Sequence, residues 1–330
     1  MKKFLGVALL ALLLPLTPWL ASPAAAADCT RTHTGRVPLT DLGTGSYMGF
    51  QGGLYSGGVN GRPPAHDAAG VSLATNAVQP RNAAGAVDPV NGKIVFASIG
   101  MSNTTQEFQR FIELAQGDPA INPRLVLVDG AQGSKDAIAW STPTADTWTV
   151  FADRLAAAGV SAPQVQAIWL KQQIAGDALG PFPGGAQTLR DRLRDIVTIA
   201  RSKYPNLRIA FLSSRAYGDY NGSTRGTGAY EQAFAVKSLI RDQINGDPRL
   251  GFGAGGPAPW VAWSTYLWAD GLGADDVPGG IPGRSDGLEW SCSDFQSDGV
   301  HPSASGRTKV ANALMTFLKS DTTATPWFAR

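Results

Sequence analysis

From Lys93 onward, short apolar segments alternate with longer amphipathic segments. The apolar segments, each predicted to form a strand, are 93–100, 124–130, 165–171, 207–214 and 260–268. The amphipathic segments, each predicted to form a helix, are 104–115, 144–159, 188–204, 230–244 and 303–321. Strands that are apolar on both faces indicate a parallel sheet covered on both sides. Right-handed crossovers then give a three-layer α/β/α, doubly wound domain.

In such a sheet, polar groups for chemistry gather where the carboxyl ends of the strands meet. This rule places five segments on one rim: Ser102, 130–133, 171–173, 214–215 and 268–270.

The first 27 residues differ from the rest of the chain. They begin with Lys2 and Lys3, continue as an apolar run and end in small residues at Ala27. This is the pattern of a secretory signal, and we expect cleavage before Asp28 and a secreted or periplasmic protein. No other apolar run is long enough to span a bilayer.

Residues 28–92 are rich in glycine and proline and show little periodicity. We predict an irregular extension packed on the core, with one short helix near 65–77. The rest of the chain, 93–330, is then predicted to form a single domain.

Without the two leader lysines the formal charge of +2 falls to zero. A neutral chain without a basic cluster is a poor candidate for binding nucleic acid or an anionic membrane surface. Its two cysteines, Cys29 and Cys292, suggest one disulfide in an exported protein, although two free thiols remain possible. Two cysteines are too few for a cysteine metal site.

The chain has three histidines: His33, His66 and His301. His301 follows Asp298 by three residues in "SDGVHPS", where the carboxylate can reach the imidazole and fix its tautomer. The alternative is an ordinary loop in which Ser303 caps the last helix.

Ser102 lies in "GMSN", at the turn between a predicted strand and a predicted helix. A serine there is either a nucleophile or a helix cap. Asn103 or Thr104 can also cap, and "TTQE" from Thr104 to Glu107 has the pattern of a capping box.

Taken together, "GMSN" after the first strand and "DGVHPS" before the last helix resemble the SGNH (GDSL-like) hydrolase superfamily. The nearest branch is that of sialate O-acetylesterases and some acetylxylan esterases, whose nucleophile string is Gly-Gln-Ser-Asn; here Met101 replaces the Gln. The resemblance covers 93–321 and implies a flavodoxin-like, mostly parallel five-stranded sheet. It also implies a catalytic triad of Ser102, His301 and Asp298.

The inner blocks match this family less well. The resemblance implies that the N–H groups of Ser102 and Gly133 line an oxyanion hole, with Gly130 in reserve. The family's third block contributes an amide donor, but this chain reads "IWLKQQIAG" there. Gln172 is the candidate for that donor, with Gln173 and Lys171 as reserves.

The implied activity is acyl transfer to Ser102 followed by hydrolysis, with no metal or other cofactor. The expected partner is a small-molecule or polysaccharide ester. Arg215, Trp268 and Asp270 are candidates for binding it. Four tryptophans in the last third of the chain suit sugar faces or aromatic acyl groups, although they also suit the core: Trp260, Trp263, Trp268 and Trp290.

The resemblance favours a short-chain ester on a carbohydrate, either an O-acetyl or a similar ester. Two alternatives remain open. One is a lipase or arylesterase on the same fold. The other is an exported carbohydrate-binding protein that has lost catalysis, with the altered "WLKQQ" block as its mark.

Overall fold

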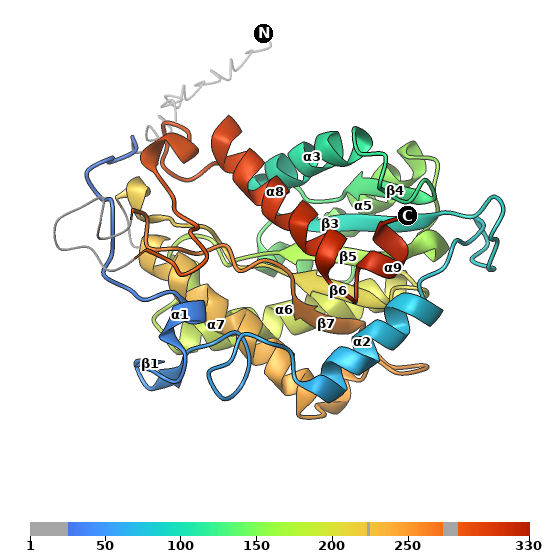
Figure 1. Ribbon diagram of the computed structural model, residues 1–330, viewed down its shortest axis with the longest axis horizontal. Helices are drawn as coiled ribbons and strands as arrows, with labels where there is room; N and C mark the ends of the chain where they lie inside the picture. The colour runs from blue at the N-terminus through green and yellow to red at the C-terminus, as the bar shows by residue number, and fades with distance from the viewer. Residues whose placement is uncertain (1–25, 223–224, 273–282) are drawn as a thin grey trace, which may run out of the picture.

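The computed structural model describes residues 26–222, 225–272 and 283–330. The predicted secretory signal therefore lies almost entirely outside the described residues. A five-stranded parallel sheet with the order β4-β3-β5-β6-β7 forms the centre (Figure 1). Its strands are β3 (Ile94–Gly100), β4 (Leu125–Asp129), β5 (Val165–Lys171), β6 (Ile209–Leu212) and β7 (Trp260–Trp263). This is the doubly wound, flavodoxin-like order, which confirms the predicted fold class.

Helices cover both faces of the sheet. One layer consists of α2 (Pro64–Asn76), α3 (Ser102–Gln116), α8 (Ala304–Ser320) and α9 (Thr325–Phe328). The other consists of α4 (Ala137–Trp140), α5 (Asp146–Ala157), α6 (Gly184–Lys203) and α7 (Arg225–Ile244). In Figure 1, α3 and α8 lie side by side over one face of the sheet. Every predicted helix is present.

The strands form because they are buried on both faces. All residues of β3 and β5 are buried, and large aromatic side chains fill the two interlayer spaces. On the α3 side, Phe96 packs against Phe108 and Phe111. On the other side, Trp140 packs edge-to-face on Trp148 with ring centroids 4.8 Å apart. Burial of such side chains is the main stabilising contribution to a fold of this kind.

The strand predicted over 260–268 is wrong in its extent. β7 ends at Trp263, and residues 264–270 continue as a buried loop. The segment is apolar because it is buried, and burial alone does not make a strand.

Residues 28–92 contain α1 (Leu39–Leu42), the two-stranded hairpin β1 (Ser46–Tyr47) and β2 (Phe50–Gln51), and α2. The predicted short helix near 65–77 is therefore confirmed. The indole N–H of Trp263 donates to Leu54 O, and that of Trp260 donates to His66 O, each at 3.0 Å. These contacts fasten the segment to β7 at the edge of the sheet.

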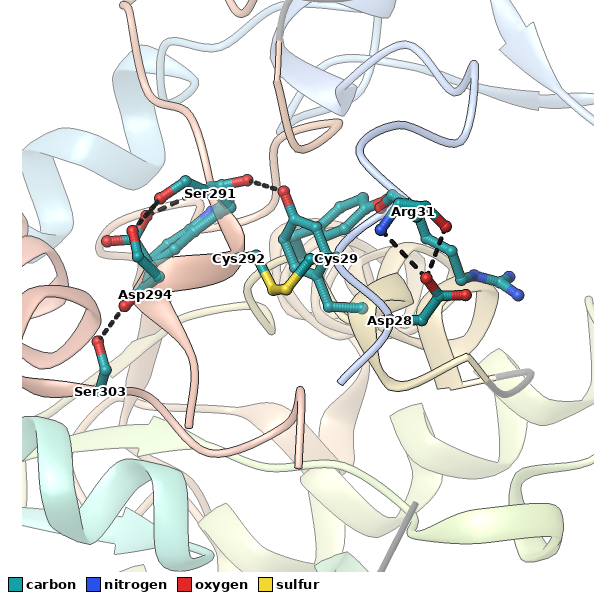
Figure 2. The surroundings of a disulfide bond; sticks show 12 residues. Asp28, Cys29, Arg31, Ser291, Cys292, Asp294 and Ser303 are labelled. Carbon is teal, nitrogen blue, oxygen red and sulfur yellow. Dashed lines mark hydrogen bonds between the residues drawn. A yellow bond between two sulfur atoms is a disulfide. The ribbon is translucent and has the colours of Figure 1, made fainter. Parts of the chain in front are cut away.

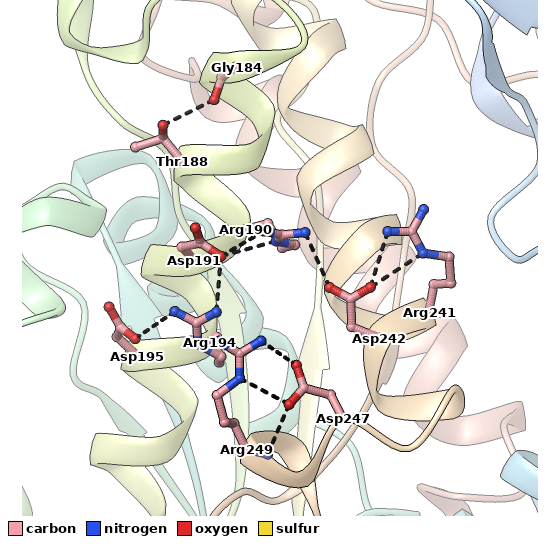
Figure 3. Close-up of polar contacts among 10 residues, drawn as sticks. All are labelled: Gly184, Thr188, Arg190, Asp191, Arg194, Asp195, Arg241, Asp242, Asp247 and Arg249. Carbon is pink, nitrogen blue, oxygen red and sulfur yellow. Dashed lines mark hydrogen bonds and ion pairs between the residues drawn. The ribbon is translucent and has the colours of Figure 1, made fainter.

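On the outer surface, alternating arginines and aspartates of α6, the end of α7 and the turn that follows form a chain of ion pairs (Figure 3). Arg190 bridges Asp191 and Asp242, so it joins the two helices. Arg249 pairs with Asp247 at 2.6 Å. Exposed pairs of this kind contribute little individually, about 0–1 kcal/mol. The network lies away from the residues singled out for chemistry.

Candidate active site

The turn from β3 into α3 requires a glycine at position 100. A Cβ on Gly100 would collide with the Thr104 side chain and lie 2.5 Å from the carbonyl oxygen of Lys171. Met101 is extended, with φ −97° and ψ −168°, and Ser102 is the first residue of α3. The strand therefore delivers Ser102 at the amino end of a helix, where its side chain faces a cavity.

The predicted capping box over Thr104–Glu107 is wrong. Because α3 begins at Ser102, Thr104 and Glu107 lie inside the helix, and Met101 at the N-cap position makes no side-chain cap. Thr104 Oγ1 instead donates to Lys171 O at 2.8 Å. Glu107 forms a buried ion pair with Lys171 Nζ, at 2.5 and 2.6 Å to its two oxygens. Both residues fix α3 against the end of β5.

Ser102, His301 and Asp298 form one continuous chain of hydrogen bonds. The Oγ of Ser102 lies 2.8 Å from Nε2 of His301, and Nδ1 of His301 lies 2.5 Å from Oδ2 of Asp298. With a proton on Nδ1, the imidazole donates to the carboxylate and leaves Nε2 free to accept from the serine hydroxyl.

The Asp298 carboxylate is held ionised by its surroundings. Its Oδ1 accepts from the backbone N–H groups of Val300 and His301, at 2.9 and 3.0 Å. Partial burial alone would raise the pKa of Asp298, but the hydrogen bonds from the His301 ring and these two N–H groups lower it below its ordinary value. A carboxylate that stays charged stabilises a positive charge on the neighbouring imidazole.

The backbone of the loop that carries Asp298 and His301 is also fixed. Gly299 has φ +64° and approaches Tyr220 so closely that a Cβ would lie 2.6 Å from Tyr220 O. Asn221 Nδ2 donates to Asp298 O at 2.7 Å. Ser303 caps α8, as the sequence alternative stated, by accepting from Gly306 N. Capping and an Asp–His pair thus coexist in one loop.

The predicted disulfide between Cys29 and Cys292 is present, with 5.4 Å between the two Cα atoms. Figure 2 shows it joining the N-terminal segment to the loop that precedes Asp298. Nearby, Ala27 N donates to Ser297 O and Asp28 N donates to Tyr220 O. The N-terminal segment therefore packs on the same loop that holds the Asp–His pair.

The two glycines considered for an oxyanion hole have different positions. A Cβ on Gly133 would lie 4.0 Å from Ser102 Cβ, so Gly133 borders the serine. Gly130 instead packs against Phe151 and the carbonyl oxygen of Ser98. The loop between Gly130 and Gly133 is fixed by two hydrogen bonds, because Thr105 Oγ1 and Arg154 Nη1 both donate to Ala131 O. Of the two glycines, only Gly133 lies beside Ser102.

The third-donor candidates also separate. Gln172 is buried, its Nε2 donates to Lys135 O at 3.0 Å, and it does not line the cavity. Lys171 is engaged by Glu107, and burial lowers the pKa of Lys171 to about 8 despite that partner. Gln173 does line the cavity. The positions of these three side chains therefore favour the reserve residue Gln173 as the third oxyanion donor, and they do not favour Gln172 or Lys171.

Ser102 and His301 both line a cavity of about 790 Å³. Of the predicted substrate residues, only Arg215 lines it. Trp268 is fully buried against Tyr230, and Asp270 is buried, where it accepts from the backbone N–H groups of Thr34 and Gly35. Trp268 and Asp270 are therefore wrong as substrate residues, because the loop after β7 turns into the core and does not end at the rim.

The four late tryptophans are core residues. Each is at most 2% exposed, and none lines the cavity. His66 is buried, stacks on Trp260 and hydrogen-bonds Val261 O, and His33 contacts Thr32; neither lines the cavity.

The described part of the chain offers no cluster of three or more His, Cys, Asp or Glu residues positioned to hold a metal ion. Within the same residues, no helix combines the length and the apolar character needed to cross a membrane.

Several cavity residues had no signal in the sequence. Asn103 lines the cavity and donates to Val300 O at 2.9 Å, but it was considered only as a helix cap. Met48, Leu179 and Phe182 come from loops that have no periodicity. A loop residue reaches a site through the fold of the whole chain, so no local pattern marks it.

Comparison with known proteins gives matches only among solved structures. No family model and no curated protein matches this chain. One similar structure is a provisionally described SGNH hydrolase from Slackia heliotrinireducens, with 14% identity, 68% of this chain and 99% of that chain covered, and a TM-score of 0.36. Another is a carbohydrate esterase family 3 protein from Talaromyces cellulolyticus, with 11% identity, 67% and 94% covered, and a TM-score of 0.38. We therefore argue the function from the geometry of the site.

Proposed function

We propose that the protein is a secreted serine esterase of the SGNH type, with Ser102, His301 and Asp298 as its catalytic triad. The observation that carries the proposal is the unbroken hydrogen-bond chain from Ser102 through His301 to Asp298, at 2.8 and 2.5 Å, beside a large cavity. A nucleophile, a base and a group that orients the base are the three parts that acyl transfer needs.

In the first half-reaction, Nε2 of His301 takes the proton from Ser102 Oγ as the oxygen attacks the ester carbonyl carbon. The resulting imidazolium is stabilised by the ionised Asp298 and then donates its proton to the leaving alcohol. In the second half-reaction, His301 activates a water that attacks the acyl-serine, and Ser102 is released with its proton restored.

The negative charge on the carbonyl oxygen needs donors in a fixed position. We assign this role to the N–H groups of Ser102 and Gly133 and to the side-chain amide of Gln173, in place of Gln172. Each such donor is typically worth about 3–4 kcal/mol of transition-state stabilisation. The bonds that hold Ala131 keep this loop preorganised.

For the substrate, the sequence resemblance supports a short-chain ester, with an O-acetyl group on a carbohydrate as the first candidate. The burial of all four tryptophans removes one reason for the carbohydrate, so a lipase or arylesterase remains the second candidate. The intact Ser102–His301 hydrogen bond argues against a binding protein that has lost catalysis. Export is supported by the leader pattern and by the Cys29–Cys292 disulfide.

The test uses the purified chain from Asp28 onward, with p-nitrophenyl acetate, butyrate and octanoate beside acetylated xylan and an O-acetyl sialate. We expect turnover of at least one ester, labelling of Ser102 by a fluorophosphonate, and loss of nearly all activity in Ser102→Ala. Ser202→Ala is the matched control, because Ser202 is exposed on α6 and bonds only its own helix. A folded Ser102→Ala protein with full activity would contradict the proposal.

A further inference from the structure

The cavity that Ser102 and His301 line is also lined by three segments that carry apolar residues: the turn of the β1–β2 hairpin, the loop after β5 and the start of α7. Six of the apolar lining residues come from these segments: Met48, Ile174, Leu179, Pro181, Phe182 and Ala229. We call these six residues the apolar compartment.

Met48 is the unusual residue of this wall. It occupies the hairpin turn with φ +48°, and the next residue, Gly49, has φ +83°. A two-residue turn with both φ values positive favours Asn and Gly, and a long apolar side chain is rarely found there. The Met48 side chain is 64% exposed and lines the cavity. The backbone conformation of the turn does not favour a methionine, so we infer that the Met48 side chain serves the cavity that it lines.

The hairpin is firmly held in this position. Tyr47 Oη donates to Glu231 Oε1 at 2.7 Å, and its ring lies edge-on to Phe182 at 5.3 Å. On the other side, Lys237 Nζ donates to the carbonyl oxygens of Gln51 and Gly52, at 2.7 and 2.5 Å. Because both flanks of the turn are bonded to α7, the backbone that carries Met48 is held in place. The hydrogen bond from Tyr47 Oη also engages the carboxylate of Glu231, which lines the cavity.

We propose that the apolar compartment binds the hydrocarbon acyl chain of the ester, and that Met48 determines how long a chain is accepted. This inference rests on the proposed esterase function. The loop after β5 contributes to the cavity both Gln173, the assigned oxyanion donor, and most of the apolar compartment. An oxyanion donor contacts the carbonyl group of the ester, so we assign the apolar residues of the same loop to the acyl chain and not to the leaving alcohol.

The size of the cavity supports a chain longer than acetyl, which favours the second substrate candidate, a lipase or arylesterase, over the O-acetyl carbohydrate ester. Its 790 Å³ falls within the range of about 300–1,000 Å³ found for sites that enclose drug-sized ligands. An acetyl group would leave most of this space unfilled. Burial of one methylene is worth about 0.8 kcal/mol, so each methylene that enters the compartment should raise kcat/KM about fourfold.

The test measures kcat/KM for two ester series. One series varies the acyl chain of p-nitrophenyl esters from acetate to decanoate; the other varies the alcohol of alkyl acetates over the same lengths. Each is run on the parent protein, Met48→Gly, Met48→Leu and the control Val59→Gly. Val59 is exposed in the same N-terminal segment and does not line the cavity. Glycine suits the positive φ of the turn, so Met48→Gly should fold.

We expect kcat/KM to rise along the acyl series up to at least hexanoate and to stay nearly flat along the alcohol series. Met48→Gly should lose about tenfold on octanoate and less than twofold on acetate, Met48→Leu should recover most of that loss, and Val59→Gly should match the parent. A chain-length effect in the alcohol series alone, or equal losses of Met48→Gly on acetate and octanoate, would overturn the proposal.

A separate measurement keeps this proposal distinct from the esterase function. Octanamide and acetamide are titrated calorimetrically into Ser102→Ala, with and without Met48→Gly. Tighter binding of octanamide that depends on Met48 supports the compartment even if no ester is turned over. Equal binding of the two amides contradicts it even if Ser102 is the nucleophile.

Discussion

Asn103 donates a hydrogen bond from Nδ2 to the carbonyl oxygen of Val300 at 2.9 Å. The two residues are the chain neighbours of Ser102 and His301, so this bond joins the start of α3 to the loop of the proposed base. We expect Asn103→Ala to lower kcat about three- to tenfold with little change in KM, as the loss of one hydrogen bond implies. The check is a comparison of the steady-state kinetics of Asn103→Ala with those of Gln109→Ala, which changes an exposed residue of the same helix. Equal kinetics for the two variants would show that the bond has no part in alignment.

The second prediction separates the base from the residue that orients it. His301→Ala should reduce activity nearly as much as Ser102→Ala, since a nucleophile and its base act as one unit and their losses do not add. Asp298→Asn should cost less, because the imidazole remains although its charged partner is lost. Single-turnover rates for the three variants and the double variant Ser102→Ala/His301→Ala test this order. A larger loss in Asp298→Asn than in His301→Ala would assign the roles differently.

The third prediction concerns pH. The base must be a neutral imidazole, so kcat/KM should rise in one step as the pH increases through the range in which a protein histidine loses its proton. The lowered pKa of Asp298 keeps its carboxylate charged throughout that range, so no second step is expected above about pH 4. The lowered pKa of Asp298 also contributes to the stability of the fold. This contribution is fully present above the pKa of an aspartate in the unfolded chain, and it is lost as the pH falls through the lower pKa of Asp298 in the folded protein. A flat rate profile from pH 5 to 8 would indicate another base.

The fourth prediction compares the same substitution at two glycines. Gly100→Ala places a Cβ against Thr104 and Lys171 O, so it should destabilise the protein by about 1–3 kcal/mol and displace Ser102. Gly133→Ala meets only Ser102 Cβ at 4.0 Å and keeps the backbone N–H, so the variant should fold normally and retain most activity. Thermal unfolding and kcat of both variants are the readouts. Similar stability for the two would mean that the turn after β3 is not sterically restricted.

The fifth prediction concerns the disulfide. Cys29→Ser/Cys292→Ser should lower the free energy of unfolding by about 2–4 kcal/mol, since the bond closes a 263-residue separation and restricts the unfolded chain. Activity at low temperature should fall less, because Asn221 Nδ2 and the backbone N–H groups of Val300 and His301 still bond Asp298. Denaturant titration with and without reductant, for parent and variant, tests this. A parent protein whose stability does not change on reduction would rule out the stabilising role.

Much of the fold is predictable because its strands are buried on both faces and so appear as continuous apolar runs. That same rule failed at Trp268 and Asp270, where a buried loop has the composition of a strand. The sequence singles out Ser102, Asp298 and His301 because they lie in two short, local strings. Their 2.8 Å contact across 199 residues of separation could only come from the fold.

The errors in the site arise from contacts between distant residues. Thr104 and Glu107 have the spacing of a capping box, but their partner is Lys171 on β5. Gln172 and Gln173 are neighbours in the sequence and alternate in direction at the end of a strand, so only the structure decides which one lines the cavity. Met48 reaches the cavity through a hairpin that no local pattern marks as near Ser102.

The bond between Cys29 and Cys292 has a further consequence for an exported protein. All five strands lie between the two cysteines. A single cut by an extracellular protease anywhere in that stretch therefore leaves the two fragments covalently joined. Strands on either side of the nick stay at a high effective concentration, so their reassociation is a first-order process that does not depend on dilution. The folded protein can therefore be cut once while its two fragments stay together.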